Sequence, residues 1–329
     1  MSRGGRLRAF LLVLLIAGAG LFGFLYLGPG PRAPQGAATT VILQKGAGIG
    51  GIAGALKAAG VIRSQIVFMV MAKLTAGSRL KAGEYEIRSG ESVAAIIADV
   101  KAGRVVRHLI TIPEGWTSQM AAEAVNAAPW LAGHAETPPE GSLLPNTYQV
   151  QRGDDRQKVV ERMQAAQRKL LAELWPRRAP GLPFTTPDQA VTLASIVEKE
   201  TALAAERPRI AAVFENRLRA GMRLESDPTV IYGVSKGAPL GRAISVADLA
   251  TATPFNTYLL VGLPPTPIAN PGRASLEAVL NPPQTNELYF VANGAGGHSF
   301  ASSFDEHQKN VARWREIEKA RTAGAGEAQ

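Results

Sequence analysis

The pattern of apolar and polar positions begins with one long apolar stretch. Residues 9–27 include no charged or strongly polar side chain. At a helical rise of ~1.5 Å per residue, such a stretch comes close to spanning the ~30 Å hydrocarbon core of a bilayer. The pattern therefore predicts a transmembrane anchor over residues 9–27, preceded by a short cytoplasmic tail at residues 1–8.

Basic residues flank this stretch unevenly. Arg3, Arg6 and Arg8 precede it, whereas only Arg32 follows soon afterwards. Positive residues mark the cytoplasmic side of a span, so we expect the N-terminus in the cytoplasm and the rest of the chain in the periplasm or another extracytoplasmic space. A cleaved signal peptide is the alternative, but its apolar region is normally ~7–15 residues long. We therefore expect an uncleaved, single-pass anchor in the cytoplasmic (inner) membrane.

A strand-then-helix pattern occurs three times in the next part of the chain. The runs VILQKGAGIGGIA, YEIRSGESVAAIIA and ITIPEGWTSQMAA begin at Val41, Tyr85 and Ile110. In each, alternating apolar residues precede a Gly turn, and spaced apolar residues follow it, which is typical of a strand leading into a helix. Ser92 and Thr117 stand where the N-cap of the second and third helices is expected.

The remaining pattern indicates linkers and a second, helix-rich part. Pro, Gly and Ala dominate residues 28–40 and predict an extended linker. Residues 155–174 alternate apolar and charged positions at helical spacing, and a tail lacking residues to bury closes the chain. We therefore expect an α+β fold with a small βα module at 41–110, a connecting segment at 111–153, a larger helix-rich domain with short strands at 154–319 and a flexible tail at 320–329.

Composition and charge narrow the possible chemistry. Apolar residues make up 46% of the chain, enough for packed cores, so global disorder is excluded. The absence of Cys removes disulfides, thiol nucleophiles and Cys-ligated zinc, and the four His show no ligand spacing, so neither a metal nor another cofactor is expected. The net charge of +9 suggests nucleic acid as a partner, but the expected extracytoplasmic location argues against it.

The sharpest chemical feature is the run TPDQAVTLASIVEKET at residues 186–201. Thr186 and Gln189 form the pattern of a capping box, with Pro187 at the first helical position. Two carboxylates, Glu198 and Glu200, come at the end of the predicted helix.

Glu200 is the better candidate for acid–base chemistry. It continues the apolar row of Leu193, Ile196 and Val197, whereas Glu198 lies on the flank of that row. A carboxyl group in a drier environment has a raised pKa, which suits a general acid at neutral pH. The alternative is a solvated Glu near the end of a helix.

Four long runs resemble one enzyme family. In order along the chain they are LASIVEKET, VFENRLRAGMRLESDPTVIYG, FNTYLLVGLPPTPIANPGRASLEAVLNP and LYFVANGAGGHSF. They are similar to motifs of the endolytic murein transglycosylase (MltG, or YceG-like) family, from about Glu140 to Trp314. The resemblance implies a lytic transglycosylase domain that acts on peptidoglycan in cell-wall biogenesis.

The resemblance also implies a reaction. Such enzymes cleave MurNAc–GlcNAc β-1,4 bonds within nascent glycan strands without water and leave 1,6-anhydro-MurNAc ends, which can terminate glycan elongation. The family's catalytic residue is the second Glu of the EKE triplet, and this position is Glu200 here. The resemblance further suggests an association with peptidoglycan synthases through the anchor.

The remaining site residues follow from the same resemblance. Within the family's motifs and a Gly-rich turn, the expected substrate-binding residues are Asp227, Thr229, Tyr232, Asn256, Thr257, Tyr258 and His298. The Tyr that usually precedes the NTY motif is Phe255 in this chain, so its hydroxyl is absent. The segment from Glu140 to Tyr148 is expected to provide packing or cleft walls.

Two questions stay open. The run from Lys45 to Ile62 resembles a LysM-type module, a βααβ unit that binds GlcNAc-containing polymers, and it could serve as a sugar-binding module or as a spacer. A non-catalytic peptidoglycan-binding scaffold, or a muramidase with Asp227 or Glu225 as second carboxylate, would also fit parts of the pattern.

Overall fold

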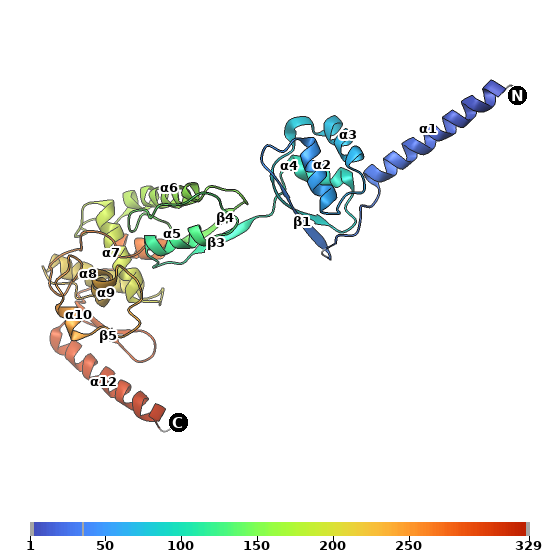
Figure 1. Ribbon diagram of the computed structural model, residues 1–329. Coiled ribbons are helices and arrows are strands. Elements are labelled where there is room, and N and C mark those ends of the chain that lie inside the picture. The colour runs from blue at the N-terminus through green and yellow to red at the C-terminus, as the bar shows by residue number, and fades with distance from the viewer. Residues whose placement is uncertain (1–2, 35, 327–329) are drawn as a thin grey trace. The chain divides into compact units, whose positions relative to one another are not determined.

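The computed structural model describes residues 3–34 and 36–326 (Figure 1). Contacts between residues divide the chain into two compact units, each with its own hydrophobic core. The first unit comprises residues 1–109, 130–132 and 149–154, and the second comprises residues 110–129, 133–148 and 155–329. The predicted connecting segment, 111–153, is thus divided between the two units.

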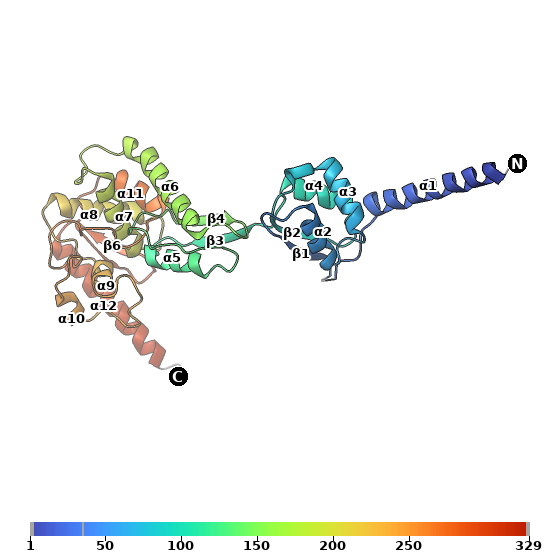
Figure 2. The ribbon, with the colours of Figure 1, turned by 45° about the horizontal axis from the view of Figure 1, so that its top comes forward.

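The first unit is a small sheet with helices packed on it. Its elements are α1 (Arg3–Leu27), β1 (Ala38–Leu43), α2 (Ile49–Ala58), α3 (Gln65–Thr75), η1 (Gly77–Arg79), β2 (Gly83–Arg88) and α4 (Val93–Ala102). Strands β1 and β2 are antiparallel neighbours (Figure 2), with Ala38 opposite Arg88 and Leu43 opposite Gly83. The order β1–α2–α3–β2 is the βααβ order that the LysM resemblance implies.

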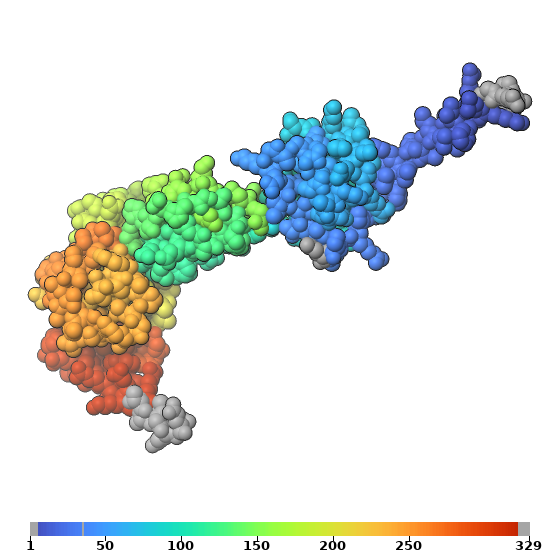
Figure 3. All heavy atoms as spheres, viewed as in Figure 1, coloured from blue at the N-terminus to red at the C-terminus, as the bar shows by residue number. Residues whose placement is uncertain are grey.

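Helix α1 carries the predicted apolar stretch. Within the described part of the chain, its residues Arg6–Leu27 form the one helix long and apolar enough to cross a membrane. None of its most apolar window is buried, and the space-filling view shows the helix exposed along most of its length (Figure 3). The first two residues of the predicted cytoplasmic tail lie outside the described residues.

Two parts of the predicted linker at residues 28–40 are held against the first unit: residues 38–40 lie in β1, and Gly30 and Pro31 contact the turn after β2. Gly30 N–H donates to the carbonyl of Gly90 (3.0 Å), and Gly90 N–H donates to the carbonyl of Pro31 (2.9 Å). A Cβ at Gly30 would lie only 2.1 Å from the carbonyl oxygen of Glu91, so Gly serves close backbone approach here. Gly30 and Pro31 thus pack on the turn after β2, and these hydrogen bonds give the backbone groups the partners that they need away from water.

The three strand-then-helix units are confirmed. They are β1 with α2, β2 with α4, and β3 (His108–Ile112) with α5 (Ser118–Ala127), although β1 begins at Ala38, before the predicted Val41. Ser92 and Thr117 are N-caps as predicted, because their hydroxyls accept from the N–H groups of Ala95 and Met120, each at 3.2 Å. Strand β3 pairs with β4 (Asn146–Val150).

The second unit is helix-rich with short strands, which confirms the expected α+β class. Its further elements are α6 (Arg156–Leu174), η2 (Trp175–Arg177), α7 (Pro187–Glu200), α8 (Arg207–Arg219), α9 (Asp227–Ser235), α10 (Val246–Ala250), α11 (Arg273–Leu280), β5 (Tyr289–Ala292), β6 (His298–Ala301) and α12 (Phe304–Gly326). Strands β5 and β6 form an antiparallel pair. Helix α12 continues through residues 320–326, where the sequence predicted a flexible tail.

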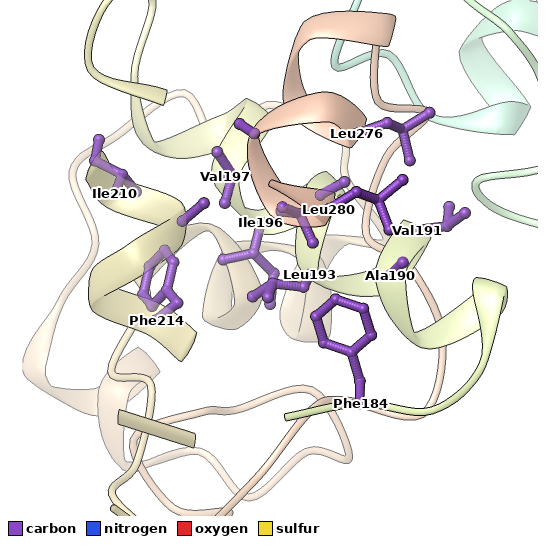
Figure 4. Close-up of a cluster of buried hydrophobic side chains, with 14 of the residues drawn as sticks. Phe184, Ala190, Val191, Leu193, Ile196, Val197, Ile210, Phe214, Leu276 and Leu280 are labelled. Atoms are coloured by element: carbon purple, nitrogen blue, oxygen red, sulfur yellow. The ribbon is translucent and has the colours of Figure 1, made fainter. Parts of the chain in front are cut away.

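Helix α7 is the centre of this unit. Its residues from Ala190 to Glu198 are all buried, and it packs against α8 and α11. Leu193 and Ile196 of α7, Phe214 of α8 and Leu280 of α11 lie in one hydrophobic cluster (Figure 4). Because α7 is fixed on several sides, its last residue, Glu200, is held in a defined place.

Candidate active site

The N-terminus of α7 fixes the start of the helix that carries Glu200. Thr186 Oγ1 accepts a hydrogen bond from Gln189 N–H (3.3 Å), and the Gln189 side chain accepts one from Thr186 N–H (3.2 Å). This is the predicted capping box, with Pro187 at the first helical position. A well-defined start and a buried body leave the C-terminal residue of α7 at the edge of the core.

Glu200 lines a pocket of about 390 Å³. The pocket's walls come from α7, α8, the start of α9, the chain around residue 258, β5 and α12. The lining residues are Glu200, Arg217, Leu224, Glu225, Asp227, Tyr258, Phe290, Val291, His307 and Val311. Among residues 3–34 and 36–326, no group of three or more His, Cys, Asp or Glu side chains is arranged to hold a metal ion.

Burial makes Glu200 an unusual carboxyl group. Desolvation, the largest cause, and the nearby negative charge of Asp227 raise the pKa of Glu200 to about 7. A hydrogen bond from Ser226 Oγ and the positive charge of Arg217 act in the opposite direction. Near neutral pH the carboxyl group can therefore exist in both forms, so it can give a proton and then accept one.

Glu198 is the more deeply buried of the two carboxylates of α7, contrary to the placement expected from the sequence. Its side chain is only 4% exposed and pairs with Arg207 Nη2 at 2.9 Å. Its other oxygen accepts hydrogen bonds from Gly272 N–H (2.9 Å) and Ser275 Oγ (2.8 Å). Glu198 thus ties α7 to α8 and α11, and its oxygens are fully engaged within the protein.

Glu215 shows that a raised pKa alone does not mark a catalytic residue. Burial raises the pKa of Glu215 to about 7, close to that of Glu200. The Glu215 side chain, however, is 0% exposed and lies 2.9 Å from Arg219 within α8. Of these two carboxyls, only Glu200 combines the shifted pKa with a pocket that can admit a substrate.

Asp227 and Tyr258, two of the predicted substrate-binding residues, line the pocket beside Glu200. The Tyr258 hydroxyl donates to Asp227 Oδ1 at 2.7 Å. Glu225, the third carboxylate of the pocket, adopts a positive φ of 52° and pairs with Arg217 Nη1 at 3.2 Å. Asp227 and Glu225 therefore each have a partner within the pocket. The pKa of Glu200 is raised in these surroundings.

Thr229, Asn256 and Thr257 are buried beneath the pocket, so they do not face a substrate in this structure. The Thr229 and Thr257 hydroxyls are 2.8 Å apart, and Thr257 Oγ1 accepts from Ser226 N–H at 2.9 Å. The Asn256 amide donates to the carbonyls of Leu249 and Thr251. This network holds Ser226 in place, and the Ser226 hydroxyl donates a hydrogen bond to Glu200. The three residues thus support the position of Glu200 without lining the pocket.

Tyr232 and His298 are not brought into the pocket. The Tyr232 hydroxyl donates to Glu140 Oε2 (3.2 Å), and its ring packs edge-on against Phe255 at 4.8 Å. His298 Nδ1 lies 2.7 Å from Glu206 Oε2, and His298 N–H donates to the other oxygen of that carboxylate. Both residues join separate segments of the second unit.

His307 of α12 lines the pocket and was missed at the sequence level. Its ring stacks on Tyr289 with the centroids 5.1 Å apart, and its Nδ1 is buried with no hydrogen-bond partner. Burial and the charge of Arg217 lower the pKa of His307, so its imidazole is neutral at neutral pH. No local pattern marks His307, because α12 reaches the pocket through tertiary packing on β5 and β6.

Arg217 of α8 is also part of the pocket. It is buried, and its Nε donates to the carbonyl of Leu288 at 2.7 Å. Its Nη1 donates to the carbonyl of Leu224 at 2.8 Å. These bonds join α8 to the chain before β5 and fix a positive charge near Glu200.

A second pocket lies in the first unit. It has a volume of about 460 Å³ and lies between the loop after β1 and the end of α3. Its lining residues are Ala47, Gly48, Ile49, Ile52, Lys73, Gly77, Ser78 and Leu80. Lys73 is the one ionisable side chain among them.

Comparisons with known proteins agree on one family. Residues 41–313 match the model of the YceG-like family. An endolytic murein transglycosylase of Bacillus subtilis is 30% identical over 328 residues, covering 90% of each chain. One of Streptococcus pneumoniae is 29% identical, covering 92% of this chain and 64% of the longer relative. A crystal structure of a yceG-like protein from Listeria monocytogenes matches with a TM-score of 0.51 and 28% identity, covering 83% of this chain and 98% of that one.

Proposed function

Because this chain belongs to the YceG-like family, we propose that it is a membrane-anchored lytic transglycosylase that cleaves peptidoglycan glycan strands from within. Glu200 is the single observation that carries this proposal. Its carboxyl group combines a pKa of about 7, a hydrogen bond from Ser226 and a place in an accessible pocket. Relatives from two bacteria that are named endolytic murein transglycosylases support the same reaction class.

The proposed reaction uses Glu200 twice. The protonated carboxyl group gives its proton to the oxygen that links MurNAc C1 to GlcNAc C4, and the C1–O bond breaks. The resulting carboxylate then takes the proton of the MurNAc C6 hydroxyl, whose oxygen forms the new bond to C1. One bond breaks, one forms and the proton returns to Glu200, so the product is a 1,6-anhydro end and no water is consumed.

The other carboxylates of the pocket support this one-acid mechanism over a two-carboxylate muramidase. A hydrolase needs a second carboxylate as nucleophile or as the base that activates water. Asp227 is engaged by Tyr258, and Glu225 by Arg217. We propose that Asp227 keeps the pKa of Glu200 high and that Arg217 stabilises the carboxylate after proton transfer.

Neutral polar groups of the pocket suit a sugar ligand. The imidazole of His307 and the phenol of Tyr258 line the same space as Glu200. Because the pKa of His307 is lowered and that of Tyr258 is raised, both are uncharged near neutral pH. We propose that they contact hydroxyl or acetamido groups of the glycan, whereas Thr229, Asn256 and Thr257 are positioning residues.

Helix α1 sets the location that we propose. It would cross the cytoplasmic membrane once, with the basic N-terminus in the cytoplasm and the pocket of Glu200 on the opposite side. There the enzyme would meet nascent glycan strands as they leave the membrane, and its cuts would end their elongation. Peptidoglycan synthases are the partners that this location suggests.

The proposal is tested by digesting isolated peptidoglycan with the full-length protein in detergent. Mass spectrometry of the released fragments should show anhydro ends, which are one water lighter than hydrolysed reducing ends. Reducing ends would contradict the transglycosylase and favour the muramidase. An absence of products, with retained glycan binding, would favour the non-catalytic scaffold.

A further inference from the structure

Helix α3 presents apolar side chains on both of its faces. Val67, Phe68 and Ala72 point into the core of the first unit and are buried. On the other face, Ile66 is 66% exposed, Val70 42% and Leu74 74%. Residues spaced by four lie on one side of a helix, so these three form one stripe, here called the α3 face.

The α3 face lies on the outer side of the helix layer. Helix α3 packs against α2 and α4, and α2 in turn packs on β1. The exposed positions of the sheet, such as Ile42 of β1 and Glu86 of β2, point away from the helices that cover its other face. The α3 face thus lies on the helix side of the unit, away from the exposed sheet positions, and no element among the described residues covers it.

The apolar helix α1 ends against α3. Helices α1 and α3 are in contact, and Tyr26 near the end of α1 packs on the core of the first unit. Arg63, just before α3, lies over the ring of Phe24 with its guanidinium carbon 6.0 Å from the centroid, and it donates to the carbonyl of Gly30. Helix α3 is therefore in contact with the C-terminal end of α1, where the chain would emerge from the membrane.

Charge in this part of the chain has one sign. Residues 1–83 contain ten Lys or Arg and no Asp or Glu, which accounts for the whole net charge of +9. Three of these basic side chains are exposed on or next to α3, close to Leu74 of the α3 face: Lys57, Arg63 and Lys73. Apolar side chains surrounded by basic ones are the combination that binds the surface of a membrane containing anionic lipids.

We propose that the α3 face rests on the anionic phospholipid surface of the membrane that α1 spans. Ile66, Val70 and Leu74 enter the boundary between headgroups and acyl chains, and the neighbouring basic side chains contact lipid phosphates. The first unit is then held flat on the membrane at two places, the span and the α3 face. This inference depends on α1 as an anchor and is independent of the reaction at Glu200.

A protein partner fits these observations less well. Three side chains are a small patch beside the ~800 Å² that each partner buries in a stable protein interface. A second copy meeting through the same face would bring its basic residues against those of the first, because a two-fold interface joins identical surfaces. Lipid phosphate is the surface of opposite charge that the span itself brings into reach.

The absence of Cys allows a direct test with the full-length protein. Leu74→Cys and, as the matched control on the sheet side, Glu86→Cys are each labelled with a fluorophore and reconstituted into vesicles that contain anionic phospholipid and brominated lipid. We expect strong quenching at position 74 and little at position 86. Because one basic residue near an anionic surface changes binding by roughly five-fold, quenching at 74 should fall at least that much in purely zwitterionic vesicles.

Substitutions on the face give a second measurement. Ile66→Ser with Val70→Ser should remove quenching of the label at 74, whereas Ile42→Ser, which changes an exposed apolar residue of the sheet side, should leave it unchanged. Thermal unfolding checks that each variant folds. Equal quenching at 74 and 86 would overturn the proposal. So would shielding of position 74 that depends on protein concentration rather than on lipid, since that would indicate a second copy.

Discussion

A pocket of the first unit, beside Lys73, and the pocket of Glu200 in the second unit are similar in size and different in chemistry. The pocket of the first unit, of about 460 Å³, is lined by small and apolar residues with Lys73 as its one ionisable group. The pocket of the second unit, of about 390 Å³, contains three carboxyl groups, Arg217, Tyr258 and His307. A hollow of this size can hold a sugar in either unit, but only the second contains a group that can move a proton near neutral pH.

The difference arises from what lies beneath each pocket. Six of the eight residues that line the first pocket are Gly, Ala, Ile or Leu. Beneath the second pocket, the hydroxyls of Thr229 and Thr257 fix Ser226, and Glu198 ties α7 to its neighbours. A catalytic carboxyl group needs such support, because burial that raises its pKa also requires its partners to be held in place.

The comparison is tested most severely by removing the acid. Glu200→Gln should lower glycan cleavage by ~10³-fold, within the range for loss of a general acid, while the fold stays intact. The matched control is Glu215→Gln, which changes a carboxyl of similar pKa that is sealed in α8. If Glu215→Gln abolishes cleavage in a folded protein and Glu200→Gln does not, the assignment of the acid is wrong.

The contribution of Glu198 to the packing beneath the pocket should be measurable as a change in the free energy of unfolding. Glu198→Ala removes the buried partner of Arg207 and leaves only the more exposed Glu114, and breaking such a buried pair typically lowers the free energy of unfolding by ~3–5 kcal/mol. Chemical denaturation measures this change. Glu114→Ala, which removes a more exposed partner of the same Arg207, should lower it by less than ~1 kcal/mol, and equal losses would contradict the account of Glu198.

The raised pKa of Glu200 also predicts how stability depends on pH. The folded state binds this proton more tightly than the unfolded state, so its contribution is full below a pH of about 4.5 and is lost as the pH rises through about 7. Because Gln cannot ionise, the free energy of unfolding of Glu200→Gln at a pH of about 8 should exceed that of the wild type by up to ~3 kcal/mol. Near pH 4 the two should differ little, and a difference that does not change with pH would contradict the raised pKa.

Thr257→Val tests the network that positions Ser226. The loss of a buried hydroxyl with two partners should lower the free energy of unfolding by ~1–3 kcal/mol. A positioning role further predicts that the pH at which cleavage is half-maximal changes, because the bond from Ser226 to Glu200 is weakened. Unchanged pH dependence in the folded variant would leave Thr257 with a structural role only.

The smallest effect is expected in the first unit. Lys73→Ala removes the one charge of its pocket, and for a solvated contact we expect a change in KM of at most ~5-fold, with kcat unchanged. Binding of soluble glycan fragments, measured by calorimetry, separates the two interpretations of this module. A loss of binding indicates a sugar-binding module, and unchanged binding and kinetics indicate a spacer.

Local signals in the sequence predicted much of the fold and the position of Glu200 in it. The capping box at Thr186, the N-caps at Ser92 and Thr117, and the strand-then-helix units depend on neighbours within a few residues, so their patterns are complete in the sequence. The position of Glu200 at the end of α7 follows from the same helical pattern. The apolar row, however, did not rank the burial of Glu198 and Glu200 correctly, because Glu198 is sealed by Arg207 and Ser275 from other helices.

Long-range contacts account for what the sequence could not predict. His307 reaches the pocket only because α12 packs on β5 and β6. Asn256 and Thr229 match motif positions, but whether such residues face a ligand or a buried network is decided by the packing of distant segments. The docking of Gly30 on the turn at Gly90 likewise has no local signal, since a Gly-rich run fits both a mobile linker and a close backbone contact.

The central claim is that Glu200 drives cleavage without water. Digestion of peptidoglycan by the full-length protein in water enriched with heavy oxygen measures this most directly. The account predicts that mass spectrometry finds anhydro ends with no heavy oxygen, and that Glu200→Gln yields none of them. New reducing ends, in excess of those in peptidoglycan incubated in the same water without the protein, would contradict the claim, because hydrolysis leaves a C1 hydroxyl that an anhydro end lacks.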